Sequence, residues 1–79
     1  MGQLAWGSQG NEVRQLQELL NQVLDGQSPL KVDGIFGPKT SARVIFFQKH
    51  AKLAADGIVG PKTNRALVGA VLSANIRGE

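Results

Sequence analysis

Apolar residues in the first third of the chain recur at steps of three and four. Charged and amide side chains fill the positions between them, which is the pattern of a helix with one apolar face. The apolar positions are Val13, Leu16, Leu20, Val23 and Leu24. The pattern predicts an amphipathic helix over residues 10–24, with Ser8 and Asn11 as candidate caps at its start. The turn-forming stretch 25–29 should end it.

Two further segments show helical spacing, and each begins at a Gly-Pro pair. Proline suits the first position of a helix because that position needs no backbone N–H donor. The pattern predicts helices over residues 38–51 and 61–73, with residues 74–79 fraying. The expected inner faces are Thr40, Val44, Phe47 and Ala51 in the first, and Thr63, Ala66, Leu67, Ala70 and Val71 in the second.

The segments before these two helices are copies of each other. VDGIFGPKT at residues 32–40 returns as ADGIVGPKT at residues 55–63, with seven of nine letters identical. A repeat of this kind indicates one supersecondary unit used twice around a shared core. The predicted fold class is therefore all-α, a small three-helix bundle with two repeated Asp-Gly turn loops preceding the second and third helices.

Each repeated loop has a structural logic that needs no ligand. The loops should be extended around a tight turn or small hairpin, in which Gly34 and Gly57 adopt positive φ. We expect Ile35 and Ile58 to fill the core between the helices. The aspartates that precede the glycines, Asp33 and Asp56, are expected to accept hydrogen bonds from loop backbone N–H groups.

Size and composition favour one small domain. The chain has 79 residues, 42% of them hydrophobic, and no cysteine, so disulfides and thiolate metal sites are excluded. We interpret residues 1–79 as a single domain with its core at about 7–73. The net charge of +3 suits an anionic partner, although the basic residues are scattered as on an ordinary solvated surface.

The chain contains neither a secretory signal nor an apolar stretch of bilayer length. Residues 1–9 have no basic start and no apolar core, and no segment approaches the roughly 20 apolar residues that a membrane helix needs. We therefore expect no membrane partner, and we interpret the chain as one module of a longer protein.

At the spaced glycines, aspartates and glutamines the chain resembles the peptidoglycan-binding domain family found beside bacterial and phage cell-wall hydrolases. The family pattern runs roughly GxxGxxVxxLQ, then DGxFGxxTxxAVxxFQ, then DGxVGxxTWxxL, and the resemblance covers about residues 7–68. The matching residues are Gly7, Gly10, Val13, Leu16, Gln17, Asp33, Gly34, Phe36, Gly37, Thr40, Val44, Phe47, Gln48, Asp56, Gly57, Val59, Gly60, Thr63 and Leu67. Two positions depart from the pattern, since Arg43 replaces a small alanine and Asn64 replaces a frequent tryptophan.

The resemblance implies a non-catalytic module that holds a tethered hydrolase or envelope protein on peptidoglycan. It also implies a location in the cell envelope or outside the cell, without a cofactor, and nothing indicates more than a monomer. The residues agree that the chain is not an enzyme. His50 is the only histidine, so a two-histidine zinc site is excluded, and Asp33 and Asp56 both lie in turns.

One stripe on the second predicted helix combines chemistry suited to such a ligand. At 100° per residue, Lys39, Arg43, Phe46 and His50 fall within about 60° of one another, beside the core face. Cations suit stem-peptide carboxylates and an aromatic ring suits sugar faces, so these four are the candidate ligand-binding residues. The alternative is that Phe46 packs under a neighbouring helix while the cations are simply solvated.

Other assignments remain beside this one. Trp6 is expected to cover the edge of the bundle, with stacking on sugar as the alternative, and Gln17 and Gln48 are expected to bind loop backbone. A nucleic-acid module is disfavoured, because the loops are not the short turn of a helix-turn-helix and no helix gathers Arg and Lys on one face. A docking or prodomain-like module stays open, since the propeptides of matrix metalloproteinases resemble this fold. Their inhibitory cysteine is missing here.

Overall fold

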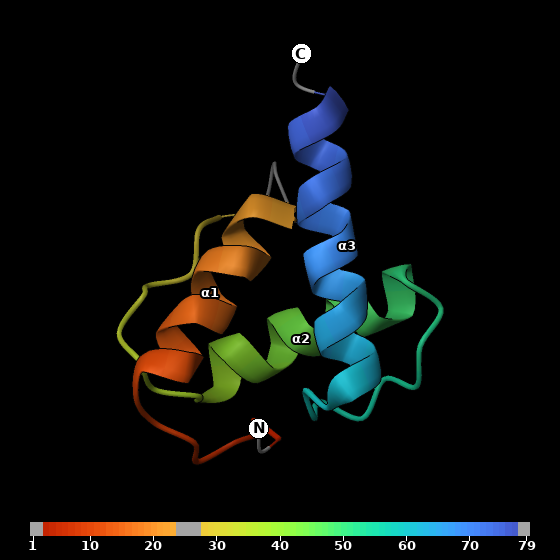
Figure 1. Ribbon diagram of the computed structural model, residues 1–79. Coiled ribbons are helices and arrows are strands. Elements are labelled where there is room, and N and C mark those ends of the chain that lie inside the picture. Colours follow the sequence, from red (N-terminus) through yellow and green to blue (C-terminus); the bar gives the residue numbers. More distant parts are fainter. Residues whose placement is uncertain (1–2, 24–27, 78–79) are drawn as a thin grey trace.

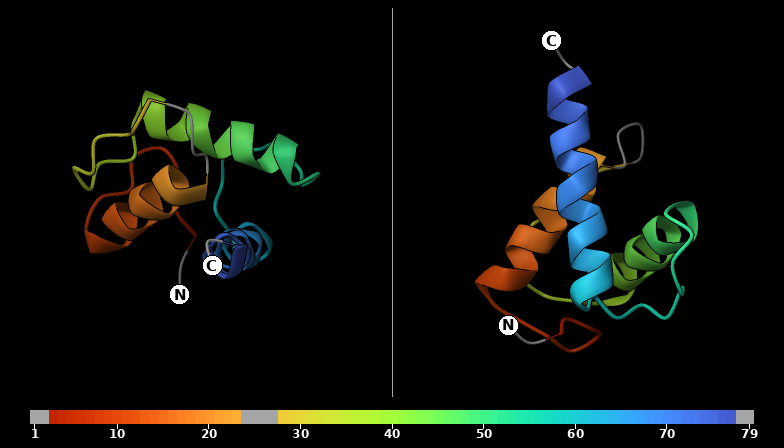
Figure 2. Two further views of the ribbon diagram at one scale, coloured as in Figure 1. Left: turned by 90° about the horizontal axis from the view of Figure 1, so that it is seen from above. Right: turned by 45° about the vertical axis from the view of Figure 1, so that its right-hand side comes forward.

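A computed structural model describes residues 3–23 and 28–77 of the chain, which form three helices (Figure 1). Helix α1 spans Asn11–Val23, α2 spans Pro38–His50 and α3 spans Pro61–Arg77. Helix α1 packs against both α3 and α2. The two views of Figure 2 show α2 lying across one side of the pair formed by α1 and α3. The predicted all-α three-helix fold is confirmed.

The helix boundaries follow local signals in the sequence. Helix α2 begins at Pro38 as predicted, and its last carbonyls accept the N–H of Ala51. The predicted end of α1 at residue 24 lies outside the described residues. The prediction that the chain frays from residue 74 was wrong, because α3 continues to Arg77. Residues 74–77 contain neither glycine nor proline, the residues that disfavour a helix most strongly.

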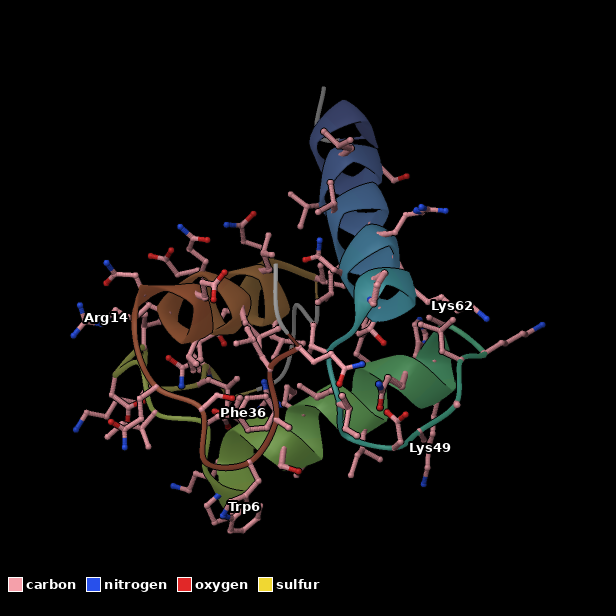
Figure 3. The ribbon with its side chains drawn as sticks, turned by 60° about the horizontal axis from the view of Figure 1, so that its bottom comes forward. Trp6, Arg14, Phe36, Lys49 and Lys62 are labelled. Carbon is pink, nitrogen blue, oxygen red and sulfur yellow. The ribbon has the colours of Figure 1, made fainter. Side chains whose placement is uncertain are left out.

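The apolar faces of the helices meet in one cluster of buried residues. Its members are Val13, Leu16, Leu20, Leu30, Phe36, Val44, Phe47, Val59 and Leu67. The helical members all belong to the predicted stripes, and Thr40 and Thr63 are buried beside them. Figure 3 shows Phe36 from the first loop lying between α1 and α2. Spacing alone therefore identified the inner face of each helix.

The loops bury different residues from those that we expected. Phe36 and Val59 are 1% and 6% exposed, whereas Ile35 and Ile58 are 54% and 38% exposed. Successive side chains of extended backbone point to opposite sides, so only one residue of each pair can enter the core. The pairing of the loops with the N-terminal segment decides which one enters.

The N-terminal segment crosses both loops. Leu4 donates its N–H to the carbonyl of Val59 at 3.1 Å and accepts the N–H of Val59 at 2.7 Å. Gly7 donates to the carbonyl of Phe36 at 3.0 Å, and Phe36 donates to the carbonyl of Ser8 at 2.9 Å. The segment thus joins the two repeats by antiparallel bridges. Each loop pairs with a distant strand-like segment, where the sequence had suggested a small hairpin within the loop.

The side chain of Trp6 is 66% exposed and does not cover the edge of the bundle, contrary to our expectation. Ser8 donates its N–H to the carbonyl of Ala5 at 2.9 Å, and Gly7 has a φ of 98°, so residues 5–8 form a turn. Trp6 is at the tip of this turn and projects outward (Figure 3). The Ser8 hydroxyl accepts the N–H of Ala5 at 3.1 Å and serves this turn, although we had expected it at the start of α1.

Within the part of the chain that the structure describes, no helix combines the length and apolar character that crossing a membrane requires.

Candidate ligand-binding surfaces

The buried amide of Gln17 on α1 fastens the loop that precedes α2. Its Nε2 lies 3.1 Å from each of three oxygens, which are Asp33 Oδ1, the Ile35 carbonyl and Thr40 Oγ1. Its Oε1 accepts the N–H of Gly34 at 3.0 Å. A backbone N–H can only donate, so this bond fixes which end of the amide faces the loop. The Nε2 group has two hydrogens for three acceptors and must share one of them.

Gln48 on α2 repeats this arrangement in the second loop. Its Nε2 lies 3.1 Å from Asp56 Oδ1, 3.0 Å from the Ile58 carbonyl and 3.1 Å from Thr63 Oγ1. Its Oε1 accepts the N–H of Gly57 at 3.0 Å. The prediction that both glutamines bind loop backbone is confirmed. A helix and the loop after it therefore form one unit, which the chain uses twice.

Each aspartate of the motif turns back onto its own loop. Asp33 Oδ1 accepts the N–H of Ile35 and Asp56 Oδ1 accepts that of Ile58, both at 3.0 Å. These backbone bonds, followed by the bond from the glutamine amide, hold the pKa of both carboxyl groups below the ordinary value. The two carboxylates stabilise two separate loops and do not face each other across one site.

The glycines after these aspartates have the predicted backbone conformation. Gly34 has a φ of 76° and Gly57 a φ of 75°, in the left-handed region that side chains disfavour. The shared backbone geometry of the two loops thus explains why the Asp-Gly pair is repeated, without any ligand.

The four predicted ligand-binding residues lie along α2, but they are not equally accessible. Lys39 and His50 are exposed, and Phe46 is 47% exposed, so it does not pack under a neighbouring helix. Arg43 is half-buried, and its Nη2 donates to the carbonyl of Ser28 at 2.7 Å. The guanidinium therefore fastens the connection between α1 and α2. The stripe presents two cationic or titratable side chains and one ring to solvent, with Arg43 behind them.

A hollow of about 350 Å³ opens beside the first loop, where α2 begins. We call it the first hollow, and its lining includes Leu30, Lys31, Asp33, Ile35, Pro38 and Lys39. A second hollow of about 510 Å³ lies beside the second loop, where α3 begins. Its lining is formed by Lys52, Leu53, Asp56, Ile58, Pro61 and Lys62.

Most residues of the two hollows correspond through the repeat, being 23 positions apart. Of the residues that line them, sequence reasoning had selected only Lys39 as a ligand-binding candidate. The repeat could have identified a second candidate, because the residue 23 positions after Lys39 is Lys62. The exposed sides of Ile35 and Ile58 could not be recognised while both were expected in the core.

A third depression, of about 540 Å³, lies between the N-terminal segment and α3. Leu4, Val59 and Val68 form its apolar wall, and Asn64 and Arg65 contribute its polar groups. Asn64 is the residue that departs from the tryptophan of the family pattern, so an aromatic side chain is missing from this groove.

Comparison with known proteins identifies a family that matches most of the chain. Residues 9–67 match a family model described as "Putative peptidoglycan binding domain". No curated protein matches the sequence.

Three solved structures are similar along most of the chain. The SleB N-terminal domain is 36% identical with a TM-score of 0.80, and the match covers 89% of this chain and 93% of that one. An L,D-transpeptidase from Xylanimonas cellulosilytica is 41% identical with a TM-score of 0.80, covering 89% of this chain but 33% of that one. A Burkholderia AP3 phage endolysin is 39% identical with a TM-score of 0.74, covering 84% of this chain and 24% of that one. The chain thus spans a third or less of the last two proteins.

Proposed function

Because the chain belongs to the peptidoglycan-binding domain family, we propose that it is a non-catalytic module that targets an associated hydrolase or envelope protein to the cell wall. The family match over residues 9–67 is the observation that carries this proposal. The transpeptidase and the endolysin support the tethering, since a domain similar to this one forms a minor part of each chain. The module would act in the cell envelope or outside the cell, as a monomer on peptidoglycan, without membrane or nucleic acid.

The positions of the carboxylates support a role in binding without catalysis. Hydrolysis of the wall needs a carboxylate pair, a metal site or an activated nucleophile. Asp33 and Asp56 are each engaged by a backbone N–H and a glutamine amide in separate loops. Among the described residues, no three His, Cys, Asp or Glu side chains gather where they could hold a metal ion.

We assign wall contact to the stripe on α2. Phe46 offers an exposed ring for a sugar face, and Lys39 and His50 lie on the same side of the helix. Arg43 supports this surface by donating to the carbonyl of Ser28, which fastens the connection before α2. A single site of this kind binds weakly and gains from the repetition of the polymer.

The test is co-sedimentation of the purified domain with insoluble peptidoglycan sacculi, stripped of teichoic acid and protein. The domain should pellet, and soluble muropeptides should compete. Phe46→Ala should weaken binding about five-fold, which corresponds to about 1 kcal/mol for an aromatic contact. Leu72→Ala is the matched control, because Leu72 is a 57% exposed apolar side chain on α3.

A protein-docking or prodomain-like role is the alternative. The apolar groove formed by Leu4, Val59 and Val68 favours it, because such a surface also suits a neighbouring domain. A domain that stays in the supernatant with sacculi would support this role and would contradict wall binding.

A further inference from the structure

The two hollows share chemistry as well as position. The first contains Lys31, Lys39 and Asp33, and the second contains Lys52, Lys62 and Asp56. All four lysines are exposed. Each aspartate accepts bonds from its own loop through Oδ1 and remains a carboxylate, so the two ammonium groups and this carboxylate leave each hollow with a net positive charge.

Each hollow also keeps an aliphatic side chain at its surface. Ile35 is 54% exposed and Ile58 is 38% exposed, although a branched aliphatic residue is most often buried. The loop geometry uses the backbone of these residues, through the bonds to the glutamine amide and the aspartate, and leaves their side chains free. A ligand entering either hollow therefore meets two cations and one carboxylate beside one aliphatic side chain.

The second lysine of each hollow does not follow from the repeat. The position 23 residues after Lys31 is Ala54, and the second hollow takes its lysine from Lys52. Lys52 has a φ of 61°, a conformation that glycine adopts at lower cost. The backbone therefore does not favour a lysine there, and the two hollows reach the same charge from different positions.

We propose that each hollow binds a carboxylate-bearing segment of a peptidoglycan stem peptide, so that one domain holds two stem peptides at once. This inference rests on the proposed function and names the part of the polymer that is recognised. Peptide carboxylates pair with the lysines, and alanine methyl groups contact Ile35 or Ile58.

The fold holds the hollows apart at a fixed spacing. The first lies beside the loop that precedes α2 and the second beside the loop that follows α2, and these two loops lie on opposite sides of Figure 1. A helix of 13 residues is about 20 Å long at 1.5 Å per residue, so the two ligands are held roughly that far apart. Two weak sites on a rigid frame gain avidity on a repetitive polymer, by a factor on the order of 10² or more.

The test compares matched lysine variants. Lys31→Glu changes the first hollow without altering the α2 stripe, Lys62→Glu changes the second, and Lys49→Glu is the control with the same charge change. Lys49 is exposed and lines neither hollow, and it belongs to α2 whereas Lys62 belongs to α3 (Figure 3). Circular dichroism checks that each variant is folded. Binding is measured by co-sedimentation with sacculi and by titration with a soluble disaccharide-tetrapeptide, followed by NMR.

The wild-type domain should take up two equivalents of the soluble fragment, with shifts in the amide signals of both Gly34 and Gly57. Each hollow variant should take up one equivalent and shift only the signal of its intact loop. On sacculi, either variant should lose at least about ten-fold in affinity because avidity is lost, while Lys49→Glu stays within about two-fold of wild type.

Three results would overturn the inference while leaving wall binding intact. The first is uptake of a single equivalent of the soluble fragment by the wild-type domain. The second is binding of the hollow variants to sacculi as strong as that of Lys49→Glu. The third is competition by glycan strands stripped of peptide that equals the competition by the disaccharide-tetrapeptide. A wild-type domain that fails to pellet with sacculi would remove the proposed function and this inference together.

Discussion

Replacing Gln48 by alanine tests whether the glutamine amide holds the second loop in place. The amide is 1% exposed and makes four hydrogen-bond contacts, three from Nε2 and one to Oε1. Alanine removes all four and leaves the helix itself intact. We therefore expect a loss of stability that originates in the loop.

The loss in the free energy of unfolding can be estimated from the polar groups that lose the Gln48 amide as a partner. The N–H of Gly57 is buried and loses its only acceptor in the structure, which costs about 1–3 kcal/mol. The buried hydroxyl of Thr63 and the part-buried carbonyl of Ile58 each lose the amide as a donor. Lost packing of the side-chain methylene adds about 1 kcal/mol. The expected total is about 2–4 kcal/mol, against a stability of about 5 kcal/mol at the lower end for small domains.

The assay is urea unfolding followed by far-ultraviolet circular dichroism. With a slope of about 1 kcal/mol per molar urea, the unfolding midpoint should fall by about 3 M or the domain should be partly unfolded in water. Gln15→Ala is the matched control, because Gln15 is exposed on α1, and it should change stability by less than about 0.5 kcal/mol. A loss below 1 kcal/mol for Gln48→Ala would refute the reasoning, since it would mean that water replaces the amide at no cost.

Gln48→Glu tests the same contacts in a second way, because its effect on stability should depend on pH. It keeps an acceptor for Gly57 but places a second carboxylate 3.1 Å from Asp56 Oδ1. Burial and the neighbouring charge should raise the pKa of the new glutamate in the folded state. A raised pKa contributes stability at low pH that is lost as the pH rises through it, so this variant should be weakest at neutral pH and recover towards pH 5. A pH-independent loss would contradict the proposed geometry.

Three further substitutions test the loops and the hollows. Gly34→Ala should destabilise more than Gly57→Ala, by about 1 kcal/mol or more beyond the 1–2 kcal/mol that positive φ costs at both positions. The new Cβ at position 34 would lie 3.1 Å from a backbone carbonyl oxygen, whereas the one at position 57 would meet side chains at 3.4 Å and beyond, which is ordinary contact. Equal losses in urea unfolding would contradict this. Replacing Asp33 and Asp56 together by asparagine should make stability depend less on pH below about pH 4. Their carboxyl pKa values are lower in the folded state than in the unfolded state, so they stabilise the fold above the unfolded pKa and lose this effect as the pH falls through the folded pKa. Thermal unfolding between pH 2 and 7 measures the difference. Lys52→Gly should raise stability by about 0.5–1 kcal/mol, because glycine adopts the positive φ of this position at lower cost. The same variant should bind sacculi more weakly. Unchanged binding would contradict a role for Lys52 in ligand binding at the second hollow.

Several features of the site were also accessible from the sequence. The roles of Gln17 and Gln48 followed from their positions at the edges of the helix stripes, and the roles of Asp33 and Asp56 followed from the Asp-Gly turns. Arg43 was different, because its spacing on the helix placed it beside Lys39 and Phe46 without indicating its bond to Ser28. The partner that takes up a side chain's hydrogen bonds depends on what the fold brings near it, and helix spacing does not contain that information.

The sequence by itself determined the features that have local causes. Helix α2 begins at Pro38 because proline already has the required φ and needs no donor, and α1 presents Val13 and Leu16 on one face because 3.6 residues complete a turn. The left-handed glycines likewise follow from the absence of a Cβ atom.

Only the tertiary structure decided which side of each extended loop faces the core. Phe36 enters and Ile35 stays outside because the N-terminal segment, far away in the chain, pairs with the loop in one register. In extended backbone a shift of one residue exchanges the two faces, so a pattern of apolar letters cannot choose between them. The same long-range pairing exposes Ile35 and Ile58 beside the lysines and so creates the two hollows.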